Sequence, residues 1–111
     1  MDINFRNKKL EKQLTSTKEL NKMGAQRARL LKQRLTEIEA SSTLAVLKLI
    51  PGPRLHPLKG NRKGQLSVDL DHPYRLIFVP NHDPVPELKS GGYDWSKITV
   101  ITIIGIADTH E

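Results

Sequence analysis

The stretch LSVDLDHPYRLIFV at residues 66–79 decides the fold of this chain. Apolar and polar residues alternate over residues 66–70, which is typical of a strand with one buried face. Residues 71–73 are Asp, His and Pro and predict a turn, after which a second strand follows. On this second strand, alternate residues starting from Tyr74 face one side and those starting from Arg75 face the other. The stretch therefore predicts two neighbouring strands of an antiparallel sheet.

A further strand and a long loop complete the second half of the chain. Residues 98–106 are apolar and carry β-branched side chains at most positions, so we expect a central strand. The connection over residues 80–97 is rich in Pro, Gly and charge. Connections of this length are usually functional or mobile. Its Tyr93 and Trp95 either pin the loop to the body of the protein or offer a stacking platform for a nucleic-acid base.

The first half of the chain is expected to be helical after a short leading strand at residues 2–5. Asn7 is placed to cap a first helix, in which Leu10 and Leu14 have the spacing of one helical face. A second helix is indicated over residues 28–38, where apolar residues recur at helical spacing among Arg and Lys. Two helices joined by a short turn predict a helical hairpin on one side of the domain.

Ser41 and Ser42 are placed to cap a short third helix. Residues 50–53, Ile-Pro-Gly-Pro, end it because proline cannot continue a helix. The expected architecture is α+β, with an N-terminal helical hairpin packed on a small antiparallel sheet. A chain of 111 residues can bury one hydrophobic core, so residues 1–111 are expected to form a single domain.

Composition narrows the possible classes of protein. A hydrophobic content of 37% and a charged content of 27% are ordinary for a globular domain, which argues against disorder. The lack of cysteine excludes disulfides and thiolate zinc sites and fits a reducing compartment. No apolar run approaches the roughly 20 residues that cross a bilayer, and the N-terminus lacks the apolar core of a signal peptide. We expect a cytoplasmic protein with no membrane partner.

The net charge of +6 is unevenly distributed. Residues 1–75 carry 16 of the 18 Lys and Arg residues but only 7 of the 12 Asp and Glu residues, whereas residues 76–111 carry 2 and 5. One basic region on a small domain favours a polyanion such as nucleic acid, or an acidic protein that masks the region. It could equally be a solvated helix surface.

Cationic and imidazole side chains gather in the segment RLHPLKG at residues 54–60, where His56 and Lys59 are three positions apart. The two residues belong either to a phosphate site or to an ordinary surface turn. Arg75 lies inside an apolar strand, where an unpaired charge is rare. It is therefore either the partner of a carboxylate such as Asp108 or a phosphate-binding group on an open sheet face.

These side chains are the kinds that metal-free RNA cleavage needs. A base must remove the proton of the ribose 2′-hydroxyl, an acid must protonate the leaving 5′ oxygen, and cations must stabilise the charge around phosphorus. Imidazole suits either proton role, and a guanidinium engages two phosphate oxygens at once. The predicted phosphate-binding residues are Arg54, Arg62 and Lys63. No Walker loop, dinucleotide fingerprint or His/Glu metal helix is present, and no metal or other cofactor is expected.

The chain resembles the RelE/ParE superfamily of bacterial toxin–antitoxin toxins, and within it the HigB-type killer-protein branch. The resemblance rests on GPRLHPLKG at residues 52–60, GQLSV at 64–68, YRLIF at 74–78 and DTH at 108–110. It covers about half of the chain closely, whereas the helical half matches only in the order and character of its elements.

This resemblance implies helices packed on one face of a small antiparallel sheet. It also implies a toxin that enters the ribosomal A site and cuts the mRNA there. Carried over by position, the active-site residues are His56, Lys59, Arg75, Asp108 and His110. In the family a tyrosine commonly lies between the last two of these residues; here Thr109 takes its place, so a stacking or proton-handling ring is missing.

Three functions follow from these observations as hypotheses. The first is a ribosome-dependent mRNA endonuclease that uses metal-free acid and base catalysis, with His56 and His110 as the candidates for proton transfer. The second is a gyrase-inhibiting toxin of the ParE kind, and the third is a noncatalytic RNA-binding or regulatory member of the family. The expected partners are a helix-turn-helix antitoxin, mRNA and ribosomal RNA, with operator DNA bound only through the antitoxin complex.

Overall fold

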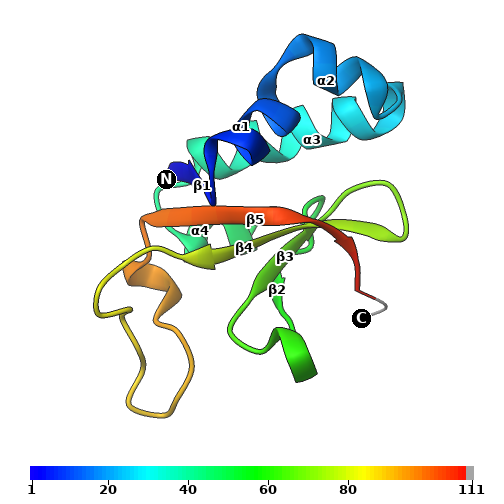
Figure 1. Ribbon diagram of the computed structural model, residues 1–111. Helices are drawn as coiled ribbons and strands as arrows, with labels where there is room; N and C mark the ends of the chain where they lie inside the picture. The colour runs from blue at the N-terminus through cyan, green and yellow to red at the C-terminus, as the bar shows by residue number, and fades with distance from the viewer. Residues whose placement is uncertain (110–111) are drawn as a thin grey trace.

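The computed structural model describes residues 1–109, in which five strands form one sheet with a layer of helices from the first part of the chain on one side (Figure 1). In chain order the elements are β1 (Asp2–Phe5), α1 (Lys8–Thr15), α2 (Thr17–Lys22), α3 (Ala25–Ala40), α4 (Leu44–Lys48), β2 (His56–Pro57), η1 (Gly60–Arg62), β3 (Leu66–Asp69), β4 (Tyr74–Pro80), η2 (Trp95–Lys97) and β5 (Val100–Asp108). Helices α1–α3 form the layer on one side, while η1 and the loop 80–97 project on the other. The α+β class is therefore confirmed.

The sheet is mixed, with strand order β1-β5-β4-β3-β2. Strands β2 to β5 pair antiparallel as expected, but β1 runs parallel to β5, with Asp2 opposite Val100 and Phe5 opposite Ile103. The alternation in residues 2–5 indicates a strand without indicating its partner. A parallel partner becomes possible because the whole intervening chain serves as the crossover connection. With β1 on its outer edge, β5 is an internal strand, as its apolar character predicts.

The predicted first helix is divided in two at Ser16. Asn7 caps α1 as predicted, since its Oδ1 accepts a hydrogen bond from the Leu10 amide at 2.8 Å. Ser16 has an extended backbone, and its hydroxyl accepts from the Glu19 amide, so the same residue ends α1 and caps α2. Within the described part of the chain, no helix is both long and apolar enough to cross a membrane.

The cap of the short helix α4 is Thr43, not Ser41 or Ser42. The Thr43 hydroxyl accepts from the Val46 amide at 3.3 Å. Ser41 instead ends α3, where its hydroxyl donates to the Glu37 carbonyl at 2.8 Å. Any of the three consecutive hydroxyl residues could cap a helix. Leu44, the first residue of α4, packs in the core, and this contact fixes where the helix begins. Thr43 immediately precedes it and is therefore the residue that caps the helix.

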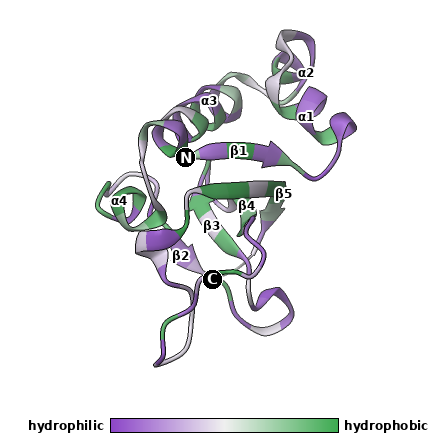
Figure 2. Ribbon diagram, turned by 90° about the vertical axis from the view of Figure 1, so that its left-hand side faces the viewer, coloured by the Kyte–Doolittle hydropathy of each residue, from purple (hydrophilic) through white to green (hydrophobic). Residues whose placement is uncertain are grey.

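The hydrophobic core lies between the helices and the sheet. Alternate strand residues point into it, and Leu76 and Phe78 of β4 belong to it, whereas Ile77 is buried on the opposite face. The predicted assignment of the two faces of β4 is therefore confirmed. Strands β4 and β5 are mostly apolar along their length (Figure 2), whereas polar and apolar residues alternate in β1 at the sheet edge. Each fully buried Leu, Ile or Phe contributes about 1.5–3 kcal/mol to folding.

One charged side chain of α3 is buried beside this core. Arg34 is only 7% exposed, and its guanidinium donates to the carbonyls of Asp69 at 2.6 Å and Gly52 at 3.2 Å. It also forms an ion pair with Glu37 at 2.8 Å. The Asp69 amide in turn donates to the Pro53 carbonyl at 2.7 Å. The segment that precedes β2 and the end of β3 are thereby attached to the same point on α3.

The loop 80–97 is attached to the body of the protein by its aromatic residues. The Tyr93 hydroxyl donates to the Gly64 carbonyl at 2.7 Å, and both Tyr93 and Trp95 pack against the core. The ammonium of Lys48 lies 5.9 Å from the centre of the Trp95 ring. Of the two roles considered for these aromatic residues, the structure therefore supports the structural one.

Replacing Arg34 by glutamine is expected to lower the free energy of unfolding by about 3 kcal/mol, because two carbonyls and a carboxylate lose their buried charged donor. Urea unfolding followed by tryptophan fluorescence measures this change. Arg29→Gln, at an exposed position of the same helix, is the matched control and should change stability by less than about 0.5 kcal/mol. Equal effects of the two substitutions would contradict the bridging role of Arg34.

A second ion pair joins α3 to the β3–β4 turn and makes stability depend on pH. The Arg27 guanidinium donates to both carboxylate oxygens of Asp71, at 2.9 and 3.1 Å, and lies 3.9 Å from the centre of the Tyr74 ring. The hydrogen bonds from Arg27 lower the pKa of Asp71 below its ordinary value of 3.8. The folded state thus binds this proton less readily than the unfolded state does. The pair stabilises the protein above the ordinary pKa, and the contribution is lost as the pH falls through the lowered one.

Asp71→Asn is therefore expected to cost about 1 kcal/mol at neutral pH. The difference from the parent protein should shrink as the pH falls below about 4, where Asp71 of the unfolded parent becomes protonated, and should vanish once the folded carboxylate is protonated as well. Urea midpoints measured between neutral pH and about pH 2.5 test this expectation. A difference that stays constant over the whole range would show that the ion pair is not its cause.

Candidate active site on the open face of the sheet

The sheet face that points away from the helices carries most of the predicted site. His56 lies opposite Ser67, which lies opposite Ile77, and Ile77 lies opposite Gly105. Cross-strand neighbours share a face. One row of side chains thus crosses four strands of the open face, starting at His56.

A second row on this face contains Asp69, Arg75 and Ala107, which lie opposite one another on β3, β4 and β5. Asp69 and Arg75 are two positions from Ser67 and Ile77 on their strands, so both rows face the same side. The row brings an acidic and a basic side chain together next to His56. Ala107 leaves the third place in the row open because its side chain is small.

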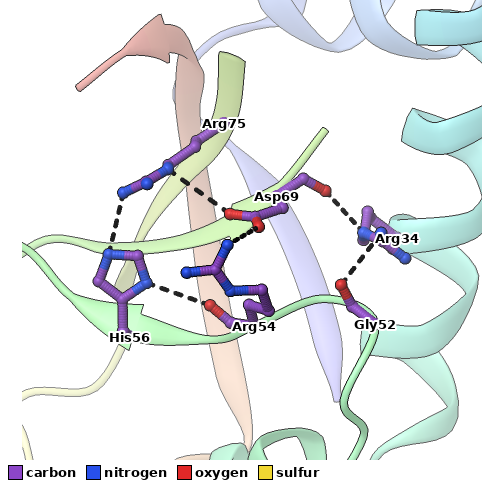
Figure 3. A network of polar contacts seen from close by, with 6 residues as sticks. All are labelled: Arg34, Gly52, Arg54, His56, Asp69 and Arg75. Atoms are coloured by element: carbon purple, nitrogen blue, oxygen red, sulfur yellow. Dashed lines mark hydrogen bonds and ion pairs between the residues drawn. The ribbon is translucent and has the colours of Figure 1, made fainter. Parts of the chain in front are cut away.

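His56 and Arg75 are in direct contact, as Figure 3 shows. The Nε2 atom of His56 lies 3.0 Å from a terminal nitrogen of Arg75, and its Nδ1 atom lies 3.1 Å from the Arg54 carbonyl. A guanidinium has only donors, so Nε2 must be the acceptor. The proton of the neutral ring is then on Nδ1, which donates to the Arg54 carbonyl. This arrangement gives His56 the tautomer whose Nε2 atom can accept a proton.

Asp69 holds the two arginines of the site. One carboxylate oxygen lies 3.1 Å from a terminal nitrogen of Arg54, and the other lies 3.5 Å from Nε of Arg75 (Figure 3). The Arg75 side chain is 12% exposed, whereas that of Arg54 is 69% exposed. Arg75 is therefore held in place by Asp69 from one side and His56 from the other. Arg54 remains accessible from solvent.

Two hollows flank this network. One, of about 480 Å³, is lined by residues that include Lys48, Arg54 and His56. The other, of about 130 Å³, is lined by residues that include His72 and Arg75. Arg54 lines both hollows, whereas Arg75 lines only the smaller one. An anionic group can therefore approach Arg54 from either side and Arg75 from the smaller hollow.

The remaining predicted residues are distributed as follows. Lys59 immediately precedes η1, next to the strand that carries His56. Arg62 donates to the Gln65 side chain at 3.1 Å, and Lys63 lines a separate hollow with Tyr93 and Trp95. Asp108 ends β5 opposite Tyr74, one position beyond the partner of Arg75. His110 lies outside the described residues. The end of β5 reaches the side of the sheet where β2 and η1 lie (Figures 1 and 2).

Sequence reasoning missed Asp69, which is the carboxylate that contacts Arg75. The signal was present. A turn over residues 71–73 places Leu70 opposite Tyr74, and one step further it places Asp69 opposite Arg75. Ser67 was also missed. It is fully buried opposite His56, and its hydroxyl has no hydrogen-bond partner within the described part of the chain.

A family model described as the RelE-like toxin of the type II toxin–antitoxin system HigB matches residues 3–87. The chain belongs to this HigB-like toxin family. The match includes the segment that carries His56 and Lys59 and the strands that carry Asp69 and Arg75, but it ends before β5 and Asp108. A search of curated proteins finds no match. Membership in a type II family implies a cognate antitoxin protein, and RelE-like toxins are generally ribonucleases.

The described residues contain no cluster of three or more His, Cys, Asp or Glu side chains that could hold a metal ion. At this HigB-like site the structure instead brings together the guanidinium groups of Arg54 and Arg75 and the carboxylate of Asp69. The imidazole of His56 contacts Arg75.

The His56 tautomer can be tested by NMR. At a pH above the titration range of histidine, long-range ¹H–¹⁵N spectra should show the proton of His56 on Nδ1. Arg75→Met should allow both tautomers, because Nε2 loses its donor. His82 is an internal control, since its Nε2 accepts from the Thr99 amide at 3.0 Å and should not change. A proton on Nε2 of His56 in the parent protein would contradict the assigned contact.

Proposed function

We propose that this HigB-like toxin is a ribosome-dependent mRNA endonuclease that cleaves RNA by acid and base catalysis without a metal. The observation that carries the proposal is the contact between His56 Nε2 and the Arg75 guanidinium on an open face of the sheet. It combines a proton acceptor with a phosphate-binding cation in one place. Neither gyrase inhibition nor simple RNA binding requires this combination.

In the proposed reaction, the ribose 2′ oxygen forms a bond to the adjacent phosphorus while the bond from phosphorus to the 5′ oxygen of the next nucleotide breaks. The products are a 2′,3′-cyclic phosphate and a 5′-hydroxyl end. His56 accepts the 2′ proton on Nε2, and an acid donates a proton to the 5′ oxygen. Arg75, with Lys59 and Arg54, binds the phosphate and stabilises the charge that develops on it.

Binding of the substrate phosphate would also free His56 Nε2 to act as the base. In the structure Arg75 donates to the atom of His56 that must accept the proton. A phosphate oxygen carries negative charge and is a stronger acceptor than a neutral imidazole. Arg75 would therefore turn its donor toward the phosphate and free Nε2, while Asp69 keeps the rest of the guanidinium in position. Base activation would thus follow phosphate binding.

The acid is proposed to come from the C-terminal end of the chain. His110 is the candidate, and Asp108 would orient or tune it.

The surface formed by Lys and Arg of the helices is proposed to contact ribosomal RNA, which would make binding weaken with salt. The cognate antitoxin is proposed to be a helix-turn-helix protein, through which the complex would bind operator DNA.

Translation of a reporter message on purified ribosomes tests the proposal. The parent protein should cut the message at codon-related positions and leave 2′,3′-cyclic phosphate and 5′-hydroxyl ends. His56→Gln should lower the cleavage rate at least about 100-fold because it removes the base. Arg75→Met should lower it by about 100- to 1,000-fold because it removes a donor to the transition state. Lys89→Met, at an exposed position of the loop 80–97 and outside the helix surface, is the control and should stay within about twofold of the parent.

Other outcomes would overturn the proposal in distinct ways. An intact message together with DNA damage in cells would indicate the gyrase-inhibiting class. An intact message with no toxicity would indicate a noncatalytic member. Cleavage with unchanged rate in His56→Gln would leave an endonuclease but would remove His56 from the role of base.

A further inference from the structure

We propose that Arg6 and Arg62 form a second anion site on the open face of the sheet and bind a phosphodiester of the message at some distance from the scissile one. This inference rests on the proposed function, because it identifies how the same face holds the substrate strand. Neither the sequence motifs nor the family resemblance points to Arg6.

A separate hollow of about 250 Å³ brings these two arginines together. Arg6 directly follows β1, and its amide donates to the Ile103 carbonyl at 2.9 Å, which places it at the outer edge of β5. Arg62 comes from η1, on the connection between β2 and β3 at the other side of the sheet. The two cations are 56 positions apart in the sequence, and both line the hollow.

The charge of this hollow is not compensated. None of the described residues that line it is acidic. The Arg6 guanidinium has neither an ion pair nor a hydrogen bond in the described part of the chain, and the only partner found for Arg62 there is the neutral amide oxygen of Gln65. Arg54 and Arg75, in contrast, share the carboxylate of Asp69. The hollow therefore attracts an anion that can bring its own negative charge.

The floor of the hollow leaves room for a ligand. Ile77, Gly105 and Ala107 line it, and Ile77 and Gly105 are the far members of the row that begins at His56. Gly105 has a φ of 152°, and no heavy atom lies within 4 Å of the place where a Cβ would be. An extra residue, Ile104, interrupts the β4–β5 pairing next to it. A glycine here keeps the backbone in this conformation and the space above it open.

The position of the hollow sets which phosphate it would bind. His56 and Gly105 are three strand spacings apart across the sheet, which corresponds to about 14 Å. This separation is too large for a phosphate bound above Gly105 to contact His56 as well. The ligand is therefore a different phosphodiester of the same strand, and the message would cross the sheet from the His56 network toward β1.

Binding of a single-stranded RNA oligonucleotide that is 2′-O-methylated, and so cannot be cleaved, tests the site by fluorescence anisotropy. Arg6→Gln and Arg62→Gln should each raise Kd about five- to tenfold at low salt. Each should also reduce the slope of log Kd against log salt by about 0.7, the value for one phosphate contact on a single strand. Arg6→Lys should restore much of the loss. Lys89→Gln, at an exposed position of the loop 80–97 that does not line the hollow, is the matched control and should bind within twofold of the parent.

Each possible result distinguishes this site from the proposed function. Unchanged affinity in Arg6→Gln and Arg62→Gln, with weaker binding in Arg75→Met, would overturn the second site and leave the nuclease proposal standing. Unchanged oligonucleotide affinity but weaker binding to ribosomes would assign the contact to ribosomal RNA and overturn its assignment to the message. Absence of oligonucleotide binding by the parent would also overturn it. Weaker binding in both variants, with no cleavage of message by the parent, would support the site and reject the nuclease.

Discussion

The buried guanidinium of Arg34 is the contact on which the rest of the site depends. A charge in this position is costly unless all of its donors find partners. Its partners are the carbonyls of Asp69 and Gly52 and the Glu37 carboxylate. By satisfying it, the fold brings the segment before His56 and the end of β3 to one place on α3. The carboxylate of Asp69 then projects from a backbone held on both sides and can orient Arg75.

One face of the sheet forms the hydrophobic core, and the other carries the candidate site. The face under the helices is filled with Leu, Ile, Val and Phe and supplies the stability of the fold. The open face carries His56, Asp69 and Arg75 at one end and the hollow between Arg6 and Arg62 at the other. Small residues on β5 keep the space between them free. Charged groups on this face can stay near water while their backbones are rigid, which is what preorganised phosphate binding requires.

Much of the fold could be predicted because its signals are local. Alternation in residues 66–79 predicts the β3–β4 hairpin and assigns the faces of β4 correctly, and an apolar segment predicts β5. Local sequence patterns did not predict the structure where neighbouring residues suit more than one arrangement equally well. Consecutive Ser and Thr residues left the cap of α4 open, and the break at Ser16 lies in a segment whose residues also suit a continuous helix.

The sequence by itself determined which kinds of chemistry are available and which strand residues share a face, because side-chain type and alternation along a strand are properties of neighbouring residues. Only the tertiary structure decided that Asp69 is the partner of Arg75, that the His56 proton lies on Nδ1, that β1 runs parallel to β5 and that Arg6 meets Arg62. These facts depend on contacts between distant segments. Such contacts are selected by the packing of the whole core and by the need to pair every buried polar group.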